Sequence, residues 1–506
     1  MNPMALIDTR RGKARRILRH APWPLALLAM AGCAVGPRFT APAPPKVDRY
    51  GPAPLPSKVG SANVPGGGIQ RFQPGQAVPE AWWRAFGSPE LDRRIALSLA
   101  HNPTVEAARA SLRQAQATLQ ATRGARFPSA DLAAGAGRTK QSVVTGGTGT
   151  PFTLYNASVN VSYTLDLFGG VRHGIELRQA QVDYQHWLLE GATLSLASNV
   201  ATASFQEAAL TEQIEATRQV VELLKEQAAI AAKQFALGAK SEVDVLAVQS
   251  QLASAEAALA PQRLALAALR NQLAVLMGRM PSQAKVQGSG LDGFQLPADV
   301  PLSLPSELVR QRPDVRAAEA QLKAATAQVG LATSNLFPQI TLGGSYGSSA
   351  TETGNLFKEP TTTWSLGLNL LQPIFHGGSL RAQKRAAEAG LDGASATYRA
   401  SVLNAFRDVS DTLNALQFDA DALEAQARAE AAAARSLKLV KADYHIGSAS
   451  YLQLLDATRQ WQLARMGYIQ ARAARLSDTA ALYAALGGGW QRQAVQAHQP
   501  APETAR

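Results

Sequence analysis

The stretch HNPTVEAARASLRQAQATL (residues 101–119) is matched about 210 positions later by QRPDVRAAEAQLKAATAQV (residues 311–329). The match continues along the chain, where FALGAKSEVDVL (235–246) corresponds to YHIGSASYLQLL (444–455). Such a period is much longer than the roughly 20 to 50 residues of a stacked repeat. The sequence therefore predicts a duplicated structural unit, with a first copy at residues 81–285, a linker at 286–303 and a second copy at 304–489.

The composition argues against several classes of protein. The 506 residues include one cysteine, so neither an intrachain disulfide nor a thiolate metal cluster is expected. The seven histidines are not placed at a metal-ligand spacing, and no local pattern indicates a catalytic assembly. Of the net charge of +12, the first 20 residues carry +5, and the remaining charge is not arranged as a basic stripe with aromatics. We therefore expect no enzyme, no cofactor and no nucleic-acid partner.

The first 33 residues predict an export signal. A basic leader precedes an apolar run at residues 23–31, and Gly32-Cys33 follows directly. This pattern resembles a bacterial lipoprotein signal, which implies removal of residues 1–32, acylation of Cys33 and, with Ala34 next, sorting to the outer membrane. Residues 33–80 are rich in proline and are expected to form the lipid anchor and an extended tether. Residues 490–506 are expected to be a disordered tail.

Each half has the predicted order helix, strand, strand, long helix, helix. The segment YNASVNVSYTLDL (155–167) alternates between apolar residues and the small polar residues Asn, Ser and Thr, ending with Asp166 on the polar face. This alternation is typical of a strand with one apolar and one wet face. The strands are expected at about 129–138, 155–168, 338–348 and 362–375.

A sheet of a soluble protein would produce the same alternation. The nearly uncharged polar faces and the export signal instead favour a membrane barrel with a water-filled interior. Four strands cannot close a barrel, and open edges cannot lie in lipid, so several chains must contribute strands. Eight strands from a dimer would leave an interior filled by side chains, whereas twelve strands from a homotrimer would leave a channel.

Two long segments without proline predict long helices. Residues 171–235 and 379–445 could each extend roughly 100 Å at about 1.5 Å per residue. Alanine-rich faces permit close packing in a coiled-coil arrangement. Each long helix is expected to turn at a glycine, Gly238 or Gly447, and the next helix begins with a pattern typical of a capping box.

At this point the chain is identified as resembling the TolC family of outer-membrane factors, in the lipoprotein branch that serves tripartite multidrug efflux pumps. The resemblance rests on CAVGP (33–37), AWWRAFGSPEL (81–91), LPSELVRQRPDVRAAEAQLKAATAQVG (304–330) and YLQLLDATRQWQLAR (451–465). It implies an α+β membrane protein in which a 12-stranded trimeric barrel is continued by an α-helical barrel. It also implies docking to a periplasmic adaptor and an inner-membrane transporter, without catalysis or a cofactor.

The resemblance places the periplasmic aperture at the hairpin tips. Asp244 and Asp456 match constricting acidic positions, whereas Gln453 stands where some members have a second aspartate. Asp244 is equally well explained as a helix-capping residue. Asp456 lies a turn too deep for a cap, so gating is the preferred interpretation, with Arg459 as a pairing partner and Leu452 as an apolar collar.

Two alternatives compete with an efflux duct. An outer-membrane duct for type I protein secretion would have the same sequence features, because the partner pump selects the cargo. A periplasmic adaptor lipoprotein should have lipoyl-like β repeats and one helical hairpin, whereas this chain predicts two hairpins and none of those repeats.

We predict that Cys33 carries lipid. Replacement of Cys33 by serine should abolish labelling with radioactive palmitate, because the cysteine is the residue that receives the acyl chains. Export and insertion are expected to continue, because a closed barrel anchors the protein on its own. Absence of label from the wild-type protein would show that the chain is not a lipoprotein.

Overall fold

The computed structural model describes residues 35–52, 56–60, 62–142, 144, 149–283, 288 and 290–489. The predicted signal peptide, Cys33 and the tail at 490–506 therefore lie outside the described residues. The chain divides into two compact units, each treated separately below. The strand unit is the described part of Met1–Pro37, Gly124–Gly174 and Val329–Lys384, and the helical unit is the described part of Arg38–Arg123, Ile175–Gln328 and Arg385–Arg506.

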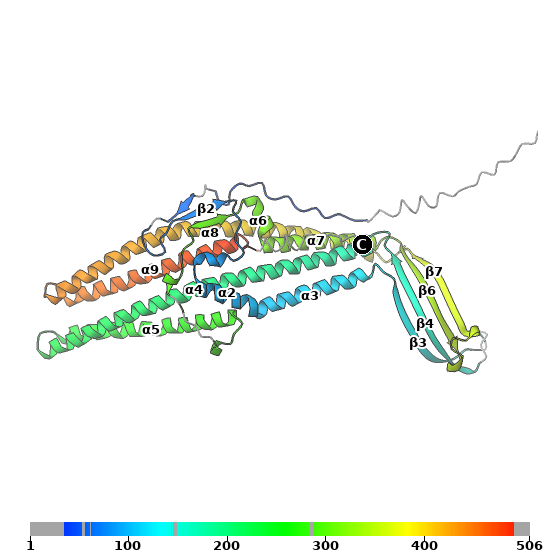
Figure 1. Cartoon of the computed structure of the whole chain (residues 1–506), viewed down its shortest axis with the longest axis horizontal. Helices are drawn as coiled ribbons and strands as arrows, with labels where there is room; N and C mark the ends of the chain where they lie inside the picture. The colour runs from blue at the N-terminus through cyan, green and yellow to red at the C-terminus, as the bar shows by residue number, and fades with distance from the viewer. Residues whose placement is uncertain are drawn as a thin grey trace, which may run out of the picture. The chain divides into compact units, whose positions relative to one another are not determined.

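The strand unit contains a four-stranded antiparallel sheet in the order β3-β4-β6-β7 (Figure 1). Its strands are β3 (Ser129–Lys140), β4 (Pro151–Leu165), β6 (Gln339–Ala350) and β7 (Thr362–Leu371). Strand β6 pairs with β4 of the first half, so the two halves of the chain share one sheet. Within this sheet, β3 and β7 are the edge strands, each with one side that has no neighbouring strand.

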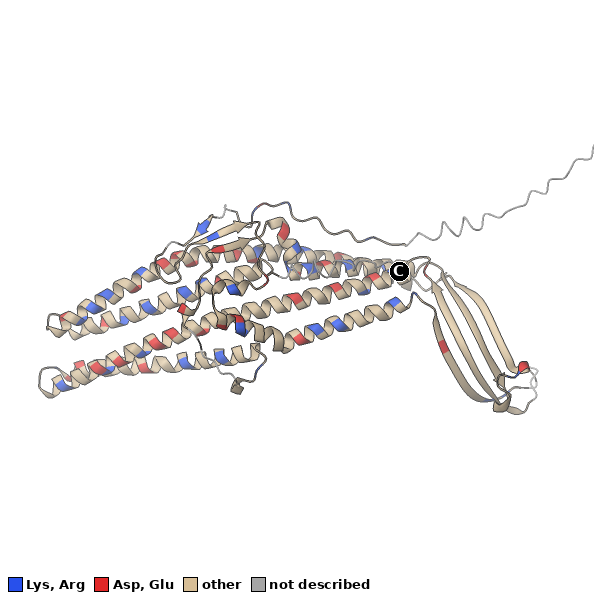
Figure 2. Ribbon diagram, viewed as in Figure 1, with Lys and Arg blue, Asp and Glu red and all other residues tan. Residues whose placement is uncertain are grey.

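The two faces of this sheet differ in chemistry. Opposed residues Leu132, Val159, Tyr346 and Trp364 form one apolar row across all four strands, and their exposed fractions are 78%, 43%, 59% and 76%. The adjacent row on the other face is polar, and in it the Ser345 and Ser365 hydroxyls are 2.8 Å apart. Figure 2 shows how few charged residues the strands carry. The sheet thus exposes apolar side chains that a water-soluble protein would cover.

Strand β4 ends earlier than the sequence predicts. Asp166, expected on the polar face of a strand reaching residue 168, lies beyond Leu165, the last residue of β4. Its carboxylate accepts hydrogen bonds from the backbone N–H groups of Val171 (3.0 Å) and Arg172 (2.9 Å). These are free N–H groups in the first turn of a helix, so the carboxylate is stabilised by capping. Strand β7 also ends before its predicted limit at 375, because Pro373 has no N–H to donate.

Three helices of each half have the same length as their counterparts in the other half. Helices α3 (Pro103–Gly124) and α7 (Pro313–Ser334) have 22 residues each. The long helices have 67 residues and the helices that return from them have 35, namely α4 (Gly170–Ala236), α8 (Ser379–His445), α5 (Glu242–Leu276) and α9 (Tyr451–Ala485). Helix α2 (Pro89–His101) precedes α3, and the short α6 (Pro305–Gln311) precedes α7. Among the described residues, no helix is both long enough and apolar enough to cross a membrane.

An aromatic cluster forms the centre of the helical unit. Trp82, in the 3-10 helix Trp82–Phe86, stacks on Tyr483 of α9 with ring centroids 5.5 Å apart. Phe86 contacts Phe205 of α4 at 4.9 Å, and Phe205 in turn contacts Phe294 at 4.9 Å. Trp82, Phe86 and Phe205 are at most 1% exposed. Buried aromatic side chains of this size contribute several kcal/mol in total, so the segment before α2 is firmly held.

A small sheet corrects two of the predicted ranges. Strands β1 (Lys58–Val59) and β2 (Gln70–Pro74) lie in the range expected to be a tether, and β5 (Asp299–Leu302) lies in the range expected to be a linker. Strand β2 pairs with β5 in parallel and with β1 antiparallel. These strands are too short to be recognised from periodicity, and their pairing is fixed by tertiary contacts.

A buried arginine attaches this sheet to helix α9. Arg475 is 1% exposed, and its guanidinium donates hydrogen bonds to the backbone oxygens of Gly66 (3.0 Å) and Gly68 (2.8 Å). Beside it, Asp419 of α8 lies close to Asp478 of α9. Burial and a hydrogen bond with Asp478 raise the pKa of Asp419 to about 7, while Arg475 opposes the shift. Below that pH, one proton is shared between the two carboxyl groups in this hydrogen bond.

This pair predicts a pH dependence of stability. The pKa of Asp419 is higher in the folded than in the unfolded protein. Its contribution to the free energy of unfolding is therefore greatest below about pH 4 and is lost as the pH rises to about 7. Asp419→Asn removes the titrating group and should stabilise the protein more at pH 8 than at pH 5. The test is the unfolding temperature at both pH values by circular dichroism, with Asp421→Asn, an exposed carboxylate of the same helix, as control. An equal shift at both values would contradict the assignment.

Candidate functional site at the hairpin tips

Both hairpins of the helical unit turn at the glycines that the sequence singled out. Gly238 and Gly447 have φ of +72° and +79°, in the left-handed region that favours glycine. At each tip the N–H of the next residue reaches back to a helix carbonyl, from Ala239 to Gln234 (2.8 Å) and from Ser448 to Asp443 (2.9 Å). These bonds satisfy carbonyls that would otherwise be free at the helix end.

Capping boxes begin both returning helices. In α5, the Ser241 hydroxyl accepts from the Asp244 N–H (3.3 Å), and the Asp244 carboxylate accepts from the Ser241 N–H (3.3 Å) and hydroxyl (2.9 Å). In α9, Ser450 and Gln453 form the same reciprocal bonds at 3.3 and 2.7 Å. The Asp244 and Gln453 side chains are therefore engaged in starting their helices, which stabilises each start by about 1 kcal/mol.

The other predicted aperture residues are exposed on α9. Leu452 is 75% exposed, and the side chains of Asp456 and Arg459 are 61% and 60% exposed. Asp456 Oδ1 lies 3.7 Å from Arg459 Nη2, and such an exposed pair contributes between 0 and about 1 kcal/mol. The structure thus brings Asp456 and Arg459 together on one turn. Asp244 lies in the other hairpin, on α5.

Four residues that sequence reasoning missed connect the two hairpins of the chain. Lys240, in the first tip, donates to the Tyr444 hydroxyl of α8 (3.1 Å) and lies 4.3 Å from the centroid of the Tyr451 ring. The Tyr451 hydroxyl donates to Gln227 Oε1 of α4 (3.2 Å). We call Lys240, Tyr444, Tyr451 and Gln227 the tip clasp. A comparison of the two halves does not reveal the tip clasp, because Ala449 occupies in the second half the position of Lys240 in the first.

The tip clasp is a dry contact beneath the turns. Tyr451 is 7% exposed and packs with Ala231 of α4 and with Val245 and Val248 of α5. Burial, with a smaller effect of nearby Tyr444, raises the pKa of Tyr451 well above its usual range, so its hydroxyl remains a hydrogen-bond donor. A lysine over an aromatic ring contributes about 0.5 to 2 kcal/mol according to its burial.

The ionisable side chains of the tips do not gather into one cluster. They are spread over separate helix starts, and the capping bonds occupy one of the carboxylates. Among the residues that the structure describes, no group of three or more His, Cys, Asp or Glu side chains could hold a metal ion. What the tips offer is a set of non-covalent contacts that join neighbouring helices.

The sequence model of the outer membrane efflux protein family matches the chain twice, at residues 95–279 and 304–488. The chain belongs to the outer membrane efflux protein family. Each match covers one set of long and returning helices with its two strands.

Curated relatives from this family are similar over nearly their whole length. The pyoverdine export outer membrane protein OpmQ of Pseudomonas aeruginosa is 34% identical over 421 residues, which is 81% of this chain and 87% of the relative. The antibiotic efflux pump outer membrane protein ArpC of Pseudomonas putida is 30% identical over 475 residues, which is 93% of this chain and 96% of the relative.

Solved structures of outer-membrane channels have the same fold. The outer-membrane channel OprN superimposes with a TM-score of 0.81 at 27% identity, over 91% of this chain and 100% of that one. The open state of the MtrE channel of Neisseria gonorrhoeae gives a TM-score of 0.78 at 27% identity, over 90% of this chain and 98% of the MtrE chain.

The tip clasp predicts a change in local stability. Lys240→Met removes the hydrogen bond to Tyr444 and the contact with the Tyr451 ring, about 1 to 2 kcal/mol together. The amides at the starts of α5 and α9 should then exchange roughly 5 to 30 times faster, measured by hydrogen–deuterium exchange with mass spectrometry. Lys441→Met, at an exposed lysine of α8, is the control and should leave these rates unchanged. Equal rates in both variants would contradict a role for the clasp.

Proposed function

We propose that this chain is the outer-membrane exit channel of a tripartite efflux system. The observation that carries the proposal is the sheet that exposes an apolar row on one face and small polar residues on the other, while both edge strands keep an open side. Such a sheet suits lipid outside and water inside once its edges are paired. Membership of the outer membrane efflux protein family supports the same conclusion.

The open edges support a homotrimer. Each chain supplies four strands, and a closed barrel around a water-filled passage needs more than eight. Three chains supply twelve, with β7 of one chain pairing with β3 of the next. The long helices of the three chains would then form a helical barrel that continues the passage through the periplasm.

The hairpin tips would form the periplasmic aperture of this trimer. Three copies of Asp456 near the axis would repel one another unless held by donors such as Arg459, with Leu452 as an apolar collar. The Asp244 and Gln453 side chains make capping bonds at the starts of their helices. A gating movement of Asp244 would have to break its capping bonds. The tip clasp would hold the two hairpins of each chain in the closed arrangement.

The partners would be a periplasmic adaptor and an inner-membrane transporter, and Cys33 would anchor the chain by lipid to the outer membrane. The relatives OpmQ and ArpC are named for pyoverdine export and for antibiotic efflux. Because relatives of similar identity are named for such different molecules, we assign cargo selection to the transporter and passive conduction of small molecules to this chain.

The proposal predicts a trimer that conducts ions. Light scattering in detergent should give three chains per particle, and planar-bilayer recordings should show single channels. Asp456→Ala should give a larger conductance or longer openings than wild type, because it removes the acceptor for Arg459. The matched control is Asp421→Ala, an exposed carboxylate on α8.

A stable monomer that inserts into membranes would overturn the barrel proposal. A correctly folded Asp456→Ala trimer with wild-type conductance would remove Asp456 from the aperture and leave it as an ordinary surface carboxylate.

A further inference from the structure

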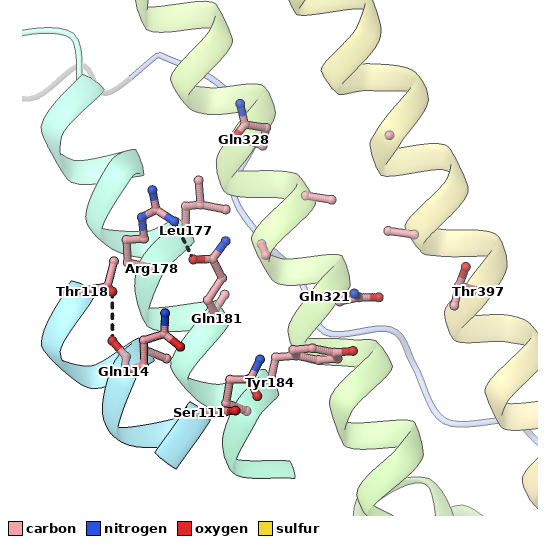
Figure 3. A pocket seen from close by; sticks show the side chains of 17 residues that line it. Ser111, Gln114, Thr118, Leu177, Arg178, Gln181, Tyr184, Gln321, Gln328 and Thr397 are labelled. Carbon is pink, nitrogen blue, oxygen red and sulfur yellow. Dashed lines mark hydrogen bonds between the residues drawn. The ribbon is translucent and has the colours of Figure 1, made fainter. Parts of the chain in front are cut away.

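A long groove runs across four helices of the helical unit. It has a volume of about 770 Å³ and is lined by α3, α4, α7 and α8 (Figure 3). Each helix contributes residues three or four positions apart, as Ser111, Gln114 and Thr118 do on α3 and Gln321, Ala324 and Gln328 on α7. Positions at this spacing lie on one side of a helix. The groove is therefore the common face of four helices, and not a gap between two of them.

The lining of the groove is almost entirely uncharged and mixes amides and hydroxyls with alanine. Glutamine, serine, threonine and alanine make up most of it, with contributions from Gln181 and Tyr184 of α4 and Thr397 of α8. Helix faces that pack in a protein core are normally apolar, so a common face rich in amides and hydroxyls is suited to water. Neutral side chains also lack the charge that would retain an ionic solute in one place.

Arg178 of α4 is the exception. Among the described residues that line the groove it is the only charged one, and none is a carboxylate. Its Nη1 donates to Gln181 Oε1 at 2.8 Å, a neutral partner that leaves the positive charge uncompensated (Figure 3). A guanidinium keeps its charge at all physiological pH values and offers several N–H donors to an anion.

We propose that this groove is the wall of the duct and that Arg178 makes it favour anions. The inference rests on the proposed trimer. The four helices form a layer that is concave on the side of the groove. Symmetric copies of the chain that continue this curvature would enclose the groove. Three Arg178 side chains would then form a ring in a water-filled passage with low-dielectric walls, which focuses their field on passing ions. The chemical class favoured is small anions, including the carboxylates and sulfates of organic cargo.

Cysteine accessibility tests whether the groove is the wall. Thr118→Cys and Gln321→Cys place a thiol on two helices of the groove. A positively charged, membrane-impermeant methanethiosulfonate reagent should lower the single-channel conductance of both full-length variants. Arg113→Cys is the control, because position 113 lies on the opposite side of α3 from Ser111, Gln114 and Thr118 and does not line the groove. The wild-type chain, with the one cysteine at position 33, shows any background reaction.

Ion selectivity tests the role of Arg178. The reversal potential in a potassium chloride gradient gives the chloride-to-potassium permeability ratio. Arg178→Gln should lower this ratio roughly twofold at 0.1 M salt, with little change at 1 M, where the charge is screened. Arg178→Lys should keep the wild-type ratio, and Arg113→Gln is the control for removing an arginine elsewhere.

The outcomes separate the two proposals. A wild-type chain that forms no conducting channel overturns the proposed function and this inference with it. A conducting wild type whose groove cysteines do not respond overturns the inference alone and indicates a groove covered by another copy of the chain. Responsive cysteines with an unchanged permeability ratio in an assembled Arg178→Gln trimer overturn the selection of anions.

Discussion

Unpaired backbone groups at the edges of the β3-β4-β6-β7 sheet are the constraint on which the rest of this protein depends. In hydrocarbon there is no water to bond the free N–H and C=O groups of β3 and β7, and each costs several kcal/mol if left without a partner. The apolar row through Leu132 and Trp364 makes water an equally poor environment for that face of the sheet. In the proposed trimer, copies of the chain that pair edge to edge would satisfy both requirements.

The helical unit solves a different problem, which is to keep helices of 67 residues ordered. Isolated helices derive little stability from propensity, so packing must hold them along their length. The aromatic cluster of Trp82, Phe86 and Tyr483 fixes the middle, where the β1-β2-β5 sheet also packs through Arg475. Towards the tips the core becomes thinner, and smaller contacts such as the tip clasp carry the packing.

This gradient gives a physical reason why the proposed aperture at the tips would be able to move. The returning helices begin with capping boxes, which stabilise each helix locally without joining it to its neighbour. The polar contacts of the tip clasp are few, namely one lysine between two tyrosines and one tyrosine–glutamine bond, and Tyr451 adds apolar packing against the first hairpin. Regions with few such contacts open at low free-energy cost while the rest of the structure stays folded. The helices can therefore remain intact while the hairpins separate.

The sequence by itself determined the features that depend on neighbouring residues. The element order, the approximate strands, the glycine turns at Gly238 and Gly447 and the capping boxes all follow from local spacing and backbone preference. The tertiary structure alone decided which distant residues meet. Strand β2 pairs with β5 more than 200 positions later, Lys240 contacts Tyr444, and four helices combine into the groove beside Arg178. Such contacts are selected by packing in three dimensions, and the periodicity of a single segment contains no record of its partner.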